Sequence, residues 1–298
     1  MDKIVKFESV SEYNALMGQE TLHPLVSVIN CSNSELLEQI LMNFGFYAIF
    51  LKDVICGDLK YGRNFYDYQK GTLVFVGPGQ IIGQENKGEY YQPQGLALIF
   101  HPDLIRGTSL APKMKDYTFF SYEVNEALHL SEKEEQIILD CLNKIDFELR
   151  QSIDKHSKTL IISNIELFLN YCARFYDRQF ITRTNANSDI LVKFEKILDD
   201  YFQSDKPQIV GLPSVGYCAN QLHLSANYFG DLIKKETGKS AQEYVQLKLM
   251  DVAKEKVLDT TKTINEIADE LGFKYPQHFT RMFKKTTGFT PNKYRLLN

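Results

Sequence analysis

The sequence predicts an α+β protein, with a β-rich N-terminal region, long helices and an all-α C-terminal domain. Short runs rich in β-branched and aromatic residues lie between roughly residues 20 and 120, a helical apolar period begins at Ser131, and a helical unit near the C-terminus occurs twice. A chain of 298 residues commonly forms two domains. We expect them at residues 1–180 and 188–298, with the polar stretch 181–189 as linker.

The predicted strands are short and separated by turn residues. They lie at residues 25–30, 46–53, 72–79 and 95–102, with Gly, Pro and Asn between them. Regular short strands of this kind predict a sandwich or a small barrel. After the first strand, residues 34–42 are predicted to form a short helix.

Two long amphipathic helices follow the strands. The first begins after Ser131, an N-cap serine followed by acidic residues that suit the helix dipole, and the second is expected over residues 158–178. Joined by a short loop, the two predict an antiparallel helical hairpin. Their apolar faces can pack on their own domain or on a second copy of the chain, so a homodimer is one of two alternatives.

Motifs for catalysis and metal binding are missing from the sequence. The five cysteines include no CxxC spacing, which favours reduced, buried thiols. None of the six histidines belongs to an HxH or HExxH cluster, and His101, at a strand end, is best explained as a structural residue. Because GxSxG, Walker A and GxGxxG sequences are also missing, we expect a protein that is not an enzyme, with no catalytic residues, no metal and no cofactor.

Membrane and export signals are also missing. The sequence has no apolar run of the roughly eighteen residues that a membrane span needs, and its N-terminus lacks the apolar segment of a signal peptide. We therefore expect a cytoplasmic protein without a membrane partner.

Charge is distributed unevenly along the chain. Residues 205–298 contain 14 Lys and Arg against 10 Asp and Glu, whereas the whole chain has a formal net charge of −4. Residues 272–295 alone contain six Lys and Arg and no acidic residue. This asymmetry indicates an end that faces nucleic acid.

An internal repeat carries most of the functional information. Residues 214–245, the first motif, align with residues 263–295, the second motif. The identities at an offset of 49 are Ala219/Ala268 and Leu222/Leu271. After a one-residue difference in the turn, the identities at an offset of 50 are Phe229/Phe279, Lys234/Lys284, Lys235/Lys285, Gly238/Gly288 and Tyr244/Tyr294.

Each motif has the sequence of a helix, a short turn and a second helix. In the second motif, Thr263 and Glu266 form a capping box, Gly272 stands where a C-cap glycine belongs, and Pro276 lies near the first turn of the next helix, which ends at Gly288. The predicted core of this motif is Ile264, Ile267, Ala268, Leu271, Phe279, Met282 and Phe283. The first motif repeats the arrangement, with Ser225 as cap, Gly238 as stop, and a core of Val215, Cys218, Ala219, Leu222, Phe229, Leu232 and Ile233. This is the helix-turn-helix arrangement.

The remaining residues of the two second helices are the candidate DNA-binding residues. Arg and Gln pair with guanine and adenine edges, and the lysines suit phosphates. In the second motif the candidates are Pro276, Gln277, His278, Thr280, Arg281, Lys284 and Lys285. In the first motif they are Asn227, Tyr228, Asp231, Lys234 and Lys235. One KK pair is usually only a solvated helix face, but its repetition in register favours DNA binding.

A long helix is predicted between the two motifs, over residues 240–260, with Ser240 and Glu243 as its capping box. A helix of about eighteen residues spans roughly 27 Å. Two recognition helices held at this distance fit successive major grooves, about 34 Å apart, if the duplex bends slightly.

Taken together, these features resemble the C-terminal DNA-binding domain of the AraC/XylS-type transcriptional regulators. The resemblance covers about 100 residues and rests on the tandem motifs, the joining helix and a matching pattern of Ile264, Glu266, Ile267, Ala268, Gly272, Phe273, Phe279, Arg281, Phe283, Lys284, Lys285, Gly288, Thr290, Pro291, Tyr294 and Arg295. It implies a sequence-specific regulator that binds double-stranded DNA at a promoter and contacts RNA polymerase, as transcription activators do.

The resemblance also implies which positions read bases. In the second motif these are Pro276, Gln277, Thr280 and Arg281, and in the first motif Asn227, Gly230 and Asp231. Because Gly230 has no side chain and Asp231 is an anion facing a polyanion, we expect the first motif mainly to position the protein.

For the N-terminal region the resemblance implies a cupin-like β-barrel followed by helices that often dimerise. Such a barrel often binds a small-molecule effector that gates DNA binding. The alternative is a domain that binds a protein partner or only dimerises. The aromatic residues Tyr61, Phe65, Tyr66, Tyr68, Tyr90 and Tyr91 could line a pocket, but are more often core fillers.

Overall fold

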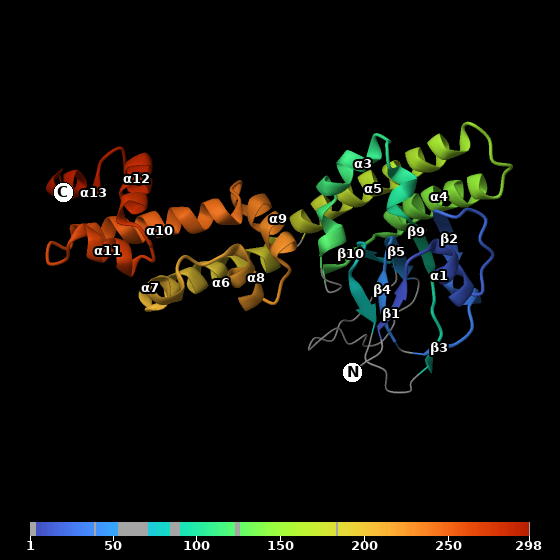
Figure 1. Cartoon of the computed structure of the whole chain (residues 1–298), viewed down its shortest axis with the longest axis horizontal. Coiled ribbons are helices and arrows are strands. Elements are labelled where there is room, and N and C mark those ends of the chain that lie inside the picture. The colour runs from blue at the N-terminus through green and yellow to red at the C-terminus, as the bar shows by residue number, and fades with distance from the viewer. Residues whose placement is uncertain are drawn as a thin grey trace. The chain divides into compact units, whose positions relative to one another are not determined.

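The computed structural model describes residues 4–38, 40–52, 71–83, 90–122, 126–182 and 184–297. The chain has an α+β fold that divides into two compact units, Met1–Thr182 and Arg183–Asn298, called here the N-terminal and C-terminal units (Figure 1). Strands occur only in the N-terminal unit among these residues, and the C-terminal unit is helical.

The main sheet of the N-terminal unit has five antiparallel strands, in the order β10-β6-β5-β9-β2. Four of them lie where the sequence predicts strands. Their bounds are β2 (Val26–Asn30), β5 (Tyr47–Lys52), β6 (Thr72–Val76) and β9 (Leu96–Phe100), and the fifth is β10 (Leu128–His129). Every residue of β6 is buried, because both faces of this strand are covered.

Two smaller sheets complete the β structure. In the first, of order β1-β4-β7, β1 runs parallel to β4 and β7 antiparallel to it. The second pairs β3 with β8. The bounds are β1 (Ile4–Phe7), β3 (Leu37–Glu38), β4 (Leu41–Phe44), β7 (Ile81–Gly83) and β8 (Tyr90–Tyr91).

The prediction of a short helix over residues 34–42 is wrong. This stretch follows a short 3-10 turn, η1 (Cys31–Asn33), and contributes β3 and the start of β4. Burial alternates along β4, with Met42 and Phe44 buried and their neighbours partly exposed, which is the period of a strand. Over so few residues an apolar run fits the period of a helix as well as that of a strand. Here the pairing of β4 with β1 and β7 makes the segment a strand.

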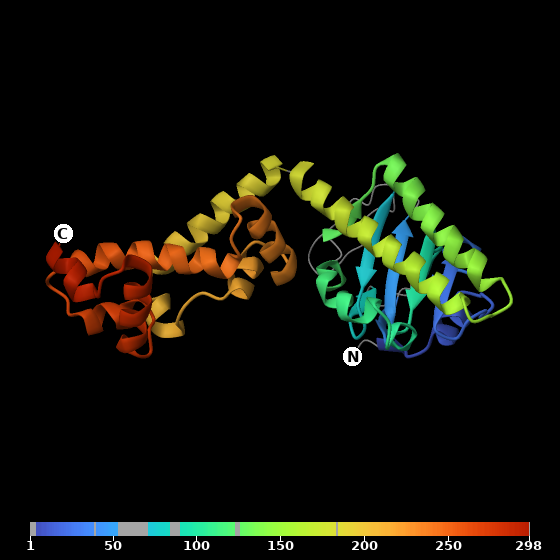
Figure 2. The ribbon, with the colours of Figure 1, turned by 90° about the horizontal axis from the view of Figure 1, so that it is seen from above.

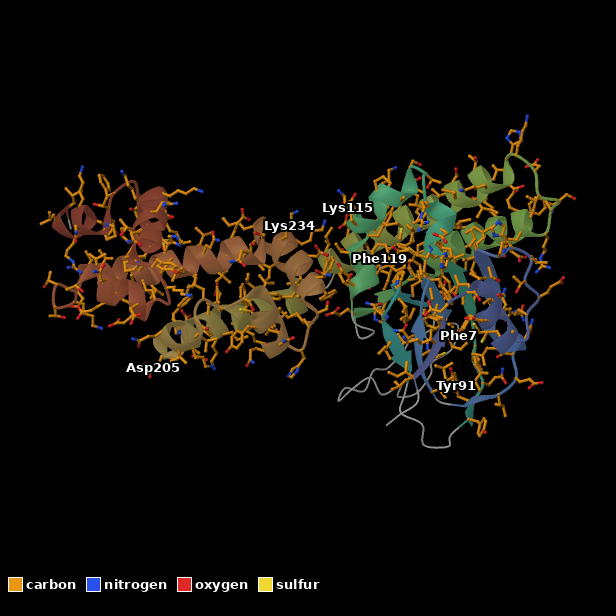
Figure 3. All side chains as sticks on the ribbon, in the orientation of Figure 1. Phe7, Tyr91, Lys115, Phe119, Asp205 and Lys234 are labelled. Atoms are coloured by element: carbon orange, nitrogen blue, oxygen red, sulfur yellow. The ribbon has the colours of Figure 1, made fainter. Side chains whose placement is uncertain are left out.

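Aromatic side chains fill the core of the N-terminal unit. Tyr13 of α1 (Val10–Leu16) packs in one cluster with Phe7, Phe44 and Phe46, with ring centroids 5.2–6.2 Å apart. Figure 3 labels Phe7 within this unit. Of the aromatic residues proposed for a pocket, Tyr90 and Tyr91 lie exposed on β8, and the others lie outside the described residues.

Short helical segments follow β9. They are α2 (Pro102–Ile105), α3 (Leu110–Lys113), η2 (Met114–Asp116) and η3 (Thr118–Ser121). His101 is the N-cap of α2, and its Nδ1 accepts a hydrogen bond from the backbone N–H of Asp103 at 3.2 Å. This contact gives His101 a structural role.

The predicted helical hairpin is present and packs on its own unit. Helices α4 (Glu132–Leu149) and α5 (Ser157–Thr182) lie side by side across one face of the five-stranded sheet (Figure 2). Ser131 and Glu134 form the capping box of α4. The buried residues of the two helices include Ile138, Cys141, Leu142, Ile145, Ile161, Ile165, Phe168, Leu169 and Cys172.

The end of α5 covers the free edge of the main sheet. The buried side-chain amide of Gln179 pairs with edge strand β10 as another strand would: its Oε1 accepts from His129 N at 2.8 Å, and its Nε2 donates to Ala127 O at 3.2 Å. Arg178 donates to the carbonyl of His129 and to Glu134. These contacts fasten the last turns of α5 to the sheet.

The stretch at residues 181–189, predicted to be the linker, is mostly helical, and the two units divide within it. Helix α5 continues to Thr182, and α6 (Thr184–Gln203) begins two residues later. The stretch is polar and lacks an apolar period, but it contains no Gly or Pro to stop a helix.

The C-terminal unit contains α6 and a further set of helices. Their bounds are α7 (Lys206–Val210), α8 (Val215–Gln221), α9 (Ala226–Thr237), α10 (Ala241–Leu258), α11 (Ile264–Glu270), α12 (Pro276–Thr287) and α13 (Pro291–Leu297). None of the helices traced in either unit is long and apolar enough to cross a membrane.

Replacing Gln179 tests its role at the sheet edge. We expect Gln179→Leu to lower the free energy of unfolding of the full chain by about 1–3 kcal/mol, because it leaves the N–H of His129 and the carbonyl of Ala127 without this partner. Urea denaturation measures the change. The matched control is Gln151→Leu on the exposed end of the hairpin, expected to change stability by less than about 0.5 kcal/mol. Equal effects of the two substitutions would contradict this role.

Candidate nucleic-acid interface

Both repeated motifs are helix-turn-helix structures with well-formed ends. In the first motif, α8 and α9 begin at Ser214 and Ser225, whose side chains accept backbone N–H groups, and α9 ends at Gly238 with φ of 71°. In the second motif, α11 begins with the predicted capping box of Thr263, and α12 ends at Gly288 with φ of 81°. Left-handed backbone at these ends explains the two glycines.

The inward faces of both motifs follow the predicted pattern with a few exceptions. The buried residues are Cys218, Ala219, Phe229, Leu232 and Ile233 in the first motif and Ile267, Ala268, Leu271, Phe279 and Phe283 in the second. The exceptions, predicted to be core but only partly buried, are Val215, Leu222, Ile264 and Met282. They lie at the edges of the apolar faces, where the two-helix packing ends.

Helix α10 joins the motifs and packs on both. Its 18 residues begin with the predicted Ser240–Glu243 capping box and correspond to roughly 27 Å of helix. Figure 1 shows α8 and α9 at one end of α10 and α11, α12 and α13 at the other. The buried stripe of α10 runs along its whole length and consists of Ala241, Val245, Leu249, Met250, Ala253 and Val257. This continuous packing fixes the distance between the motifs.

Helix α6 supports the first motif by packing against α9 and α10. The ring of Phe194 packs edge-on against Phe229 of α9, with centroids 4.9 Å apart, and also contacts Tyr244 of α10. The Tyr244 hydroxyl donates to the carboxylate of Glu195. Burial, followed by this hydrogen bond, raises the pKa of Tyr244 to about 12. Lys248 adds an ion pair to Asp199 at 2.7 Å, so α6 and α10 clamp α9 in place.

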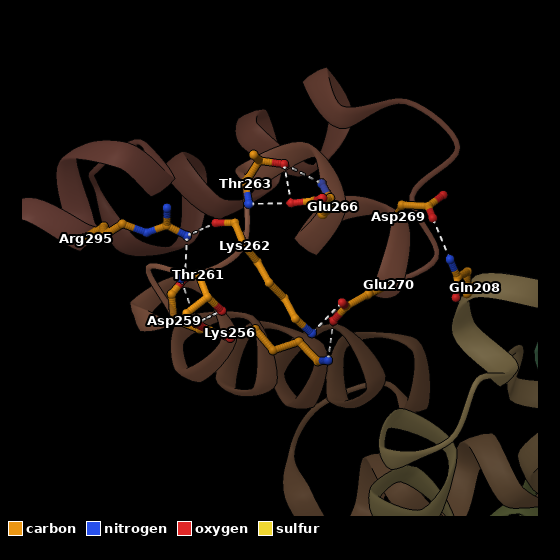
Figure 4. Close-up of polar contacts among 10 residues, drawn as sticks. All are labelled: Gln208, Lys256, Asp259, Thr261, Lys262, Thr263, Glu266, Asp269, Glu270 and Arg295. Carbon is orange, nitrogen blue, oxygen red and sulfur yellow. Dashed lines mark hydrogen bonds and ion pairs between the residues drawn. The ribbon is translucent and has the colours of Figure 1, made fainter.

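Arg295 fastens the second motif at its C-terminal end (Figure 4). Its guanidinium donates to the carbonyls of Val257, Asp259 and Lys262, at 2.6, 2.9 and 3.0 Å. These carbonyls belong to the end of α10 and the loop before α11. The positive charge therefore lies where the dipole of α10 is negative, and α13 is tied to the loop.

A second group of contacts in Figure 4 holds α11 on its neighbours. Glu270 accepts hydrogen bonds from Lys256 at 2.8 Å and from Lys262 at 2.5 Å, and these bonds hold its pKa below the ordinary value. Gln208 of α7 donates to Asp269 at 2.7 Å. Because the groups are partly exposed, each contact stabilises α11 only modestly.

The turn of the second motif requires a glycine. Gly272 has φ of 82°, and a Cβ at this position would lie 2.4 Å from the carbonyl oxygen of Pro207. The equivalent position of the first motif is His223, a non-glycine residue with φ of 57°. The sequence identified Gly272 as a helix end, and the structure adds that α7 approaches it closely.

Most of the predicted DNA-binding side chains are exposed on the second helices. On α12 these are Gln277, His278, Arg281, Lys284 and Lys285, with Pro276 and Thr280 partly buried beside them. On α9 they are Asn227, Lys234 and Lys235, with Asp231 partly buried; Figure 3 labels Lys234. Each helix therefore presents one polar face, as a groove-binding helix requires.

Tyr228 is the exception, because it was predicted to be exposed and is only 5% exposed. It occupies the first turn of α9, where its backbone N–H donates to the Ser225 side chain. A tyrosine ring is large enough to reach the core from a helix edge, so its position in the pattern misled the prediction. The ring of Tyr275, immediately before α12, is exposed beside these side chains.

The described parts of the chain contain no cluster of three or more His, Cys, Asp or Glu side chains that could hold a metal ion.

Comparison with known proteins places the same segment among transcriptional regulators. Residues 218–296 match a family described as "Helix-turn-helix domain". The Transposon Tn10 TetD protein of Escherichia coli is 32% identical over 143 residues, which is 48% of this chain and 91% of TetD. The multiple antibiotic resistance protein MarA of Salmonella typhimurium is 34% identical over 67 residues, 22% of this chain and 53% of MarA.

Regulators of Bacillus subtilis also match part of this chain. The HTH-type transcriptional regulator YtdP of Bacillus subtilis is 28% identical over 149 residues, which is 50% of this chain and 19% of YtdP. The chain spans 19%, 30% and 45% of three such Bacillus subtilis regulators, so less than half the length of each.

Two glycines with similar backbone conformations test the close approach at the turn. We expect Gly288→Ala to cost about 1 kcal/mol of stability, because only its left-handed φ disfavours a side chain and nothing lies within 4 Å of the added Cβ. Gly272→Ala should cost about 1–3 kcal/mol more, because its Cβ also meets the Pro207 carbonyl. Thermal unfolding of the two variants measures the difference, and equal losses would contradict the close approach.

Proposed function

Because the chain belongs to the AraC/XylS-type family of transcriptional regulators, we propose that it is a sequence-specific DNA-binding regulator of transcription. The observation that carries the proposal is the paired arrangement of α9 and α12. Both are second helices of a helix-turn-helix, both expose a Lys-Lys pair in register, and both are fixed to α10. We propose that it acts in the cytoplasm at a promoter, with RNA polymerase as a partner.

The two recognition helices have different roles in this proposal. Helix α12 reads bases, because Gln277 and Arg281 are exposed one turn apart and their side chains pair bidentately with adenine and guanine. Thr280, next to Arg281, suits a thymine methyl group. Lys284 and Lys285, in the last turn, bind phosphates and set the register.

Helix α9 positions the protein on the duplex. An added Cβ at Gly230 would meet nothing within 4 Å, so packing within the protein does not require a glycine there. A glycine in the middle of a helix costs about 0.5–1 kcal/mol relative to alanine. A close approach of the DNA backbone would explain why position 230 is a glycine. Lys234 then supplies a phosphate contact near the C-terminal end of α9.

The spacing along α10 favours simultaneous binding by both motifs. The roughly 27 Å of this helix is shorter than the 34 Å that separates successive major grooves on one face of straight DNA. Slight bending of the duplex toward the protein closes the difference, at a cost that depends on the bent sequence. Such bending adds specificity at base pairs that no side chain contacts.

The N-terminal unit gates DNA binding in this proposal, as a cupin-like module that binds a small effector. Helix α5 supports it, because Gln179 and Arg178 fasten its end to β10 of the main sheet, and the chain then leads directly into α6 of the C-terminal unit. A change in the sheet would therefore act on the helix that precedes the DNA-binding motifs. The alternative is an N-terminal unit that binds a protein partner or only forms a homodimer.

Two substitutions on α12 separate base reading from phosphate binding. On a sequence selected from a random duplex pool, Arg281→Ala should weaken binding by about 1–3 kcal/mol and relax specificity at one or two base pairs. Lys285→Ala should weaken binding to all sequences alike and reduce the slope of log K against log salt by about 1. Fluorescence anisotropy over a salt series measures both. Arg281→Ala binding every sequence as the wild type does would contradict base reading by α12.

Thermal-shift measurements distinguish an effector sensor from the alternatives. At 100 times its Kd, a ligand that binds only the folded N-terminal unit stabilises it by about 2.7 kcal/mol and raises its melting temperature by several degrees. We expect at least one member of a library of sugars and small metabolites to do this. A uniformly negative screen would favour the protein-partner alternative.

A further inference from the structure

Helix α12 begins differently from the other helices of the two motifs. The residues preceding α8, α9, α10 and α11 are Ser214, Ser225, Ser240 and Thr263, and each accepts a backbone N–H of the first turn with its side-chain oxygen. The residue preceding α12 is Tyr275, which has an extended backbone and makes no such side-chain bond. A phenol at an N-cap forgoes the stabilisation that Ser, Thr, Asp or Asn provides there.

The repeat makes the comparison direct, because Tyr275 aligns with Ser225 at the same offset of 50 that relates α12 to α9. The two helices have the same length, 12 residues, and the same αL glycine at their ends. In the first motif the cap is a serine that accepts from Tyr228 N at 3.1 Å. The second motif has lost this contact in favour of an aromatic ring.

Core packing does not account for the ring. The Tyr275 ring is 52% exposed. The core therefore does not require an aromatic ring here, and a smaller polar residue would fit the same position. The contacts of Tyr275 are with other exposed groups: the His278 ring centroid lies 5.6 Å away, and the Lys274 ammonium lies 5.9 Å from the Tyr275 ring. Within the described part of the chain, no residue forms a hydrogen bond with its hydroxyl group.

The position of these groups points to the DNA backbone. Tyr275 immediately precedes Pro276 and Gln277, the first residues of the helix that carries Arg281. When α12 enters the major groove, Tyr275 therefore lies at the edge of that groove. At least half of protein–DNA hydrogen bonds go to phosphate and sugar, and tyrosine hydroxyls are among the groups that bind phosphate oxygens. Lys274 brings a positive charge to the same edge.

We propose that Tyr275 is a DNA-backbone contact of the second motif, for which the chain gives up a helix cap. The phenol hydroxyl donates to a phosphate oxygen, and the ring, held by His278, packs on the adjoining deoxyribose. The contact fixes how deeply the N-terminal turn of α12 enters the major groove. This inference rests on the proposed DNA-binding function and assigns it a further residue.

Replacing Tyr275 with the residue of the first motif gives a test with two opposite outcomes. Tyr275→Ser restores an N-cap, so we expect the melting temperature of the full chain to rise by about 2–6 °C. The same substitution removes the phosphate and sugar contact, so the affinity for a duplex selected from a random pool should fall about tenfold. A residue with only a structural role would not move stability and affinity in opposite directions.

Two further variants separate the parts of the contact. Tyr275→Phe keeps the ring and loses the hydroxyl, so we expect an unchanged melting temperature and a loss of affinity of about threefold. Ser240→Ala removes the cap of α10, so it should lower the melting temperature by a few degrees. The affinity for DNA, measured at about 20 °C, should not change. This control shows that the assay separates stability from binding.

The outcomes distinguish this inference from the function on which it rests. If the wild-type chain binds the selected duplex and Tyr275→Ser binds it equally well or better, the contact proposed for Tyr275 is wrong and DNA binding stands. If the wild-type chain binds no duplex from the pool, both proposals are wrong.

Discussion

The continuous packing of α10 is the constraint on which the C-terminal unit depends. One stripe of small and apolar residues, from Ala241 to Val257, is buried along the whole helix, with the first motif against one end and the second against the other. A helix packed over its full length cannot shorten or bend without opening both contacts. The relative placement of α9 and α12 is therefore a property of the fold, and the DNA has to adjust to it.

The two motifs share a sequence pattern but are supported by different chemistry. Aromatic contacts and a tyrosine–carboxylate hydrogen bond connect the first motif to α6. In the second motif, Arg295 binds three backbone carbonyls, and α7 approaches Gly272. A duplicated unit has thus kept its internal core while its outer contacts diverged. The same divergence extends to the recognition helices, where α12 carries Arg281 and an uncapped start and α9 carries Gly230 and a serine cap.

Periodic and local features could be predicted from the sequence, and contacts between distant segments could not. The capping box at Thr263 and the terminal glycine Gly288 have local signatures, so the start of α11 and the end of α12 could be predicted correctly. The strand at β4 was missed because a short apolar run fits two periods, and Tyr228 was placed on the wrong face because one large ring can reach the core from a helix edge. The carbonyl contacts of Arg295 have no sequence signature, because any segment provides carbonyls.

Hydroxyl-radical footprinting of the chain on a selected duplex tests the central claim most directly. A rigid pair of recognition helices predicts two protected stretches on one face of the DNA, centred about 10 base pairs apart. Because α9 contacts phosphates and α12 reads bases in this account, five base pairs inserted between the two stretches should leave the second stretch about 10 base pairs from the first, now over different sequence. A single protected stretch on the original duplex, or a second stretch that moves away with its original sequence after the insertion, would contradict the account, because the motifs would then bind independently of the spacing that α10 imposes.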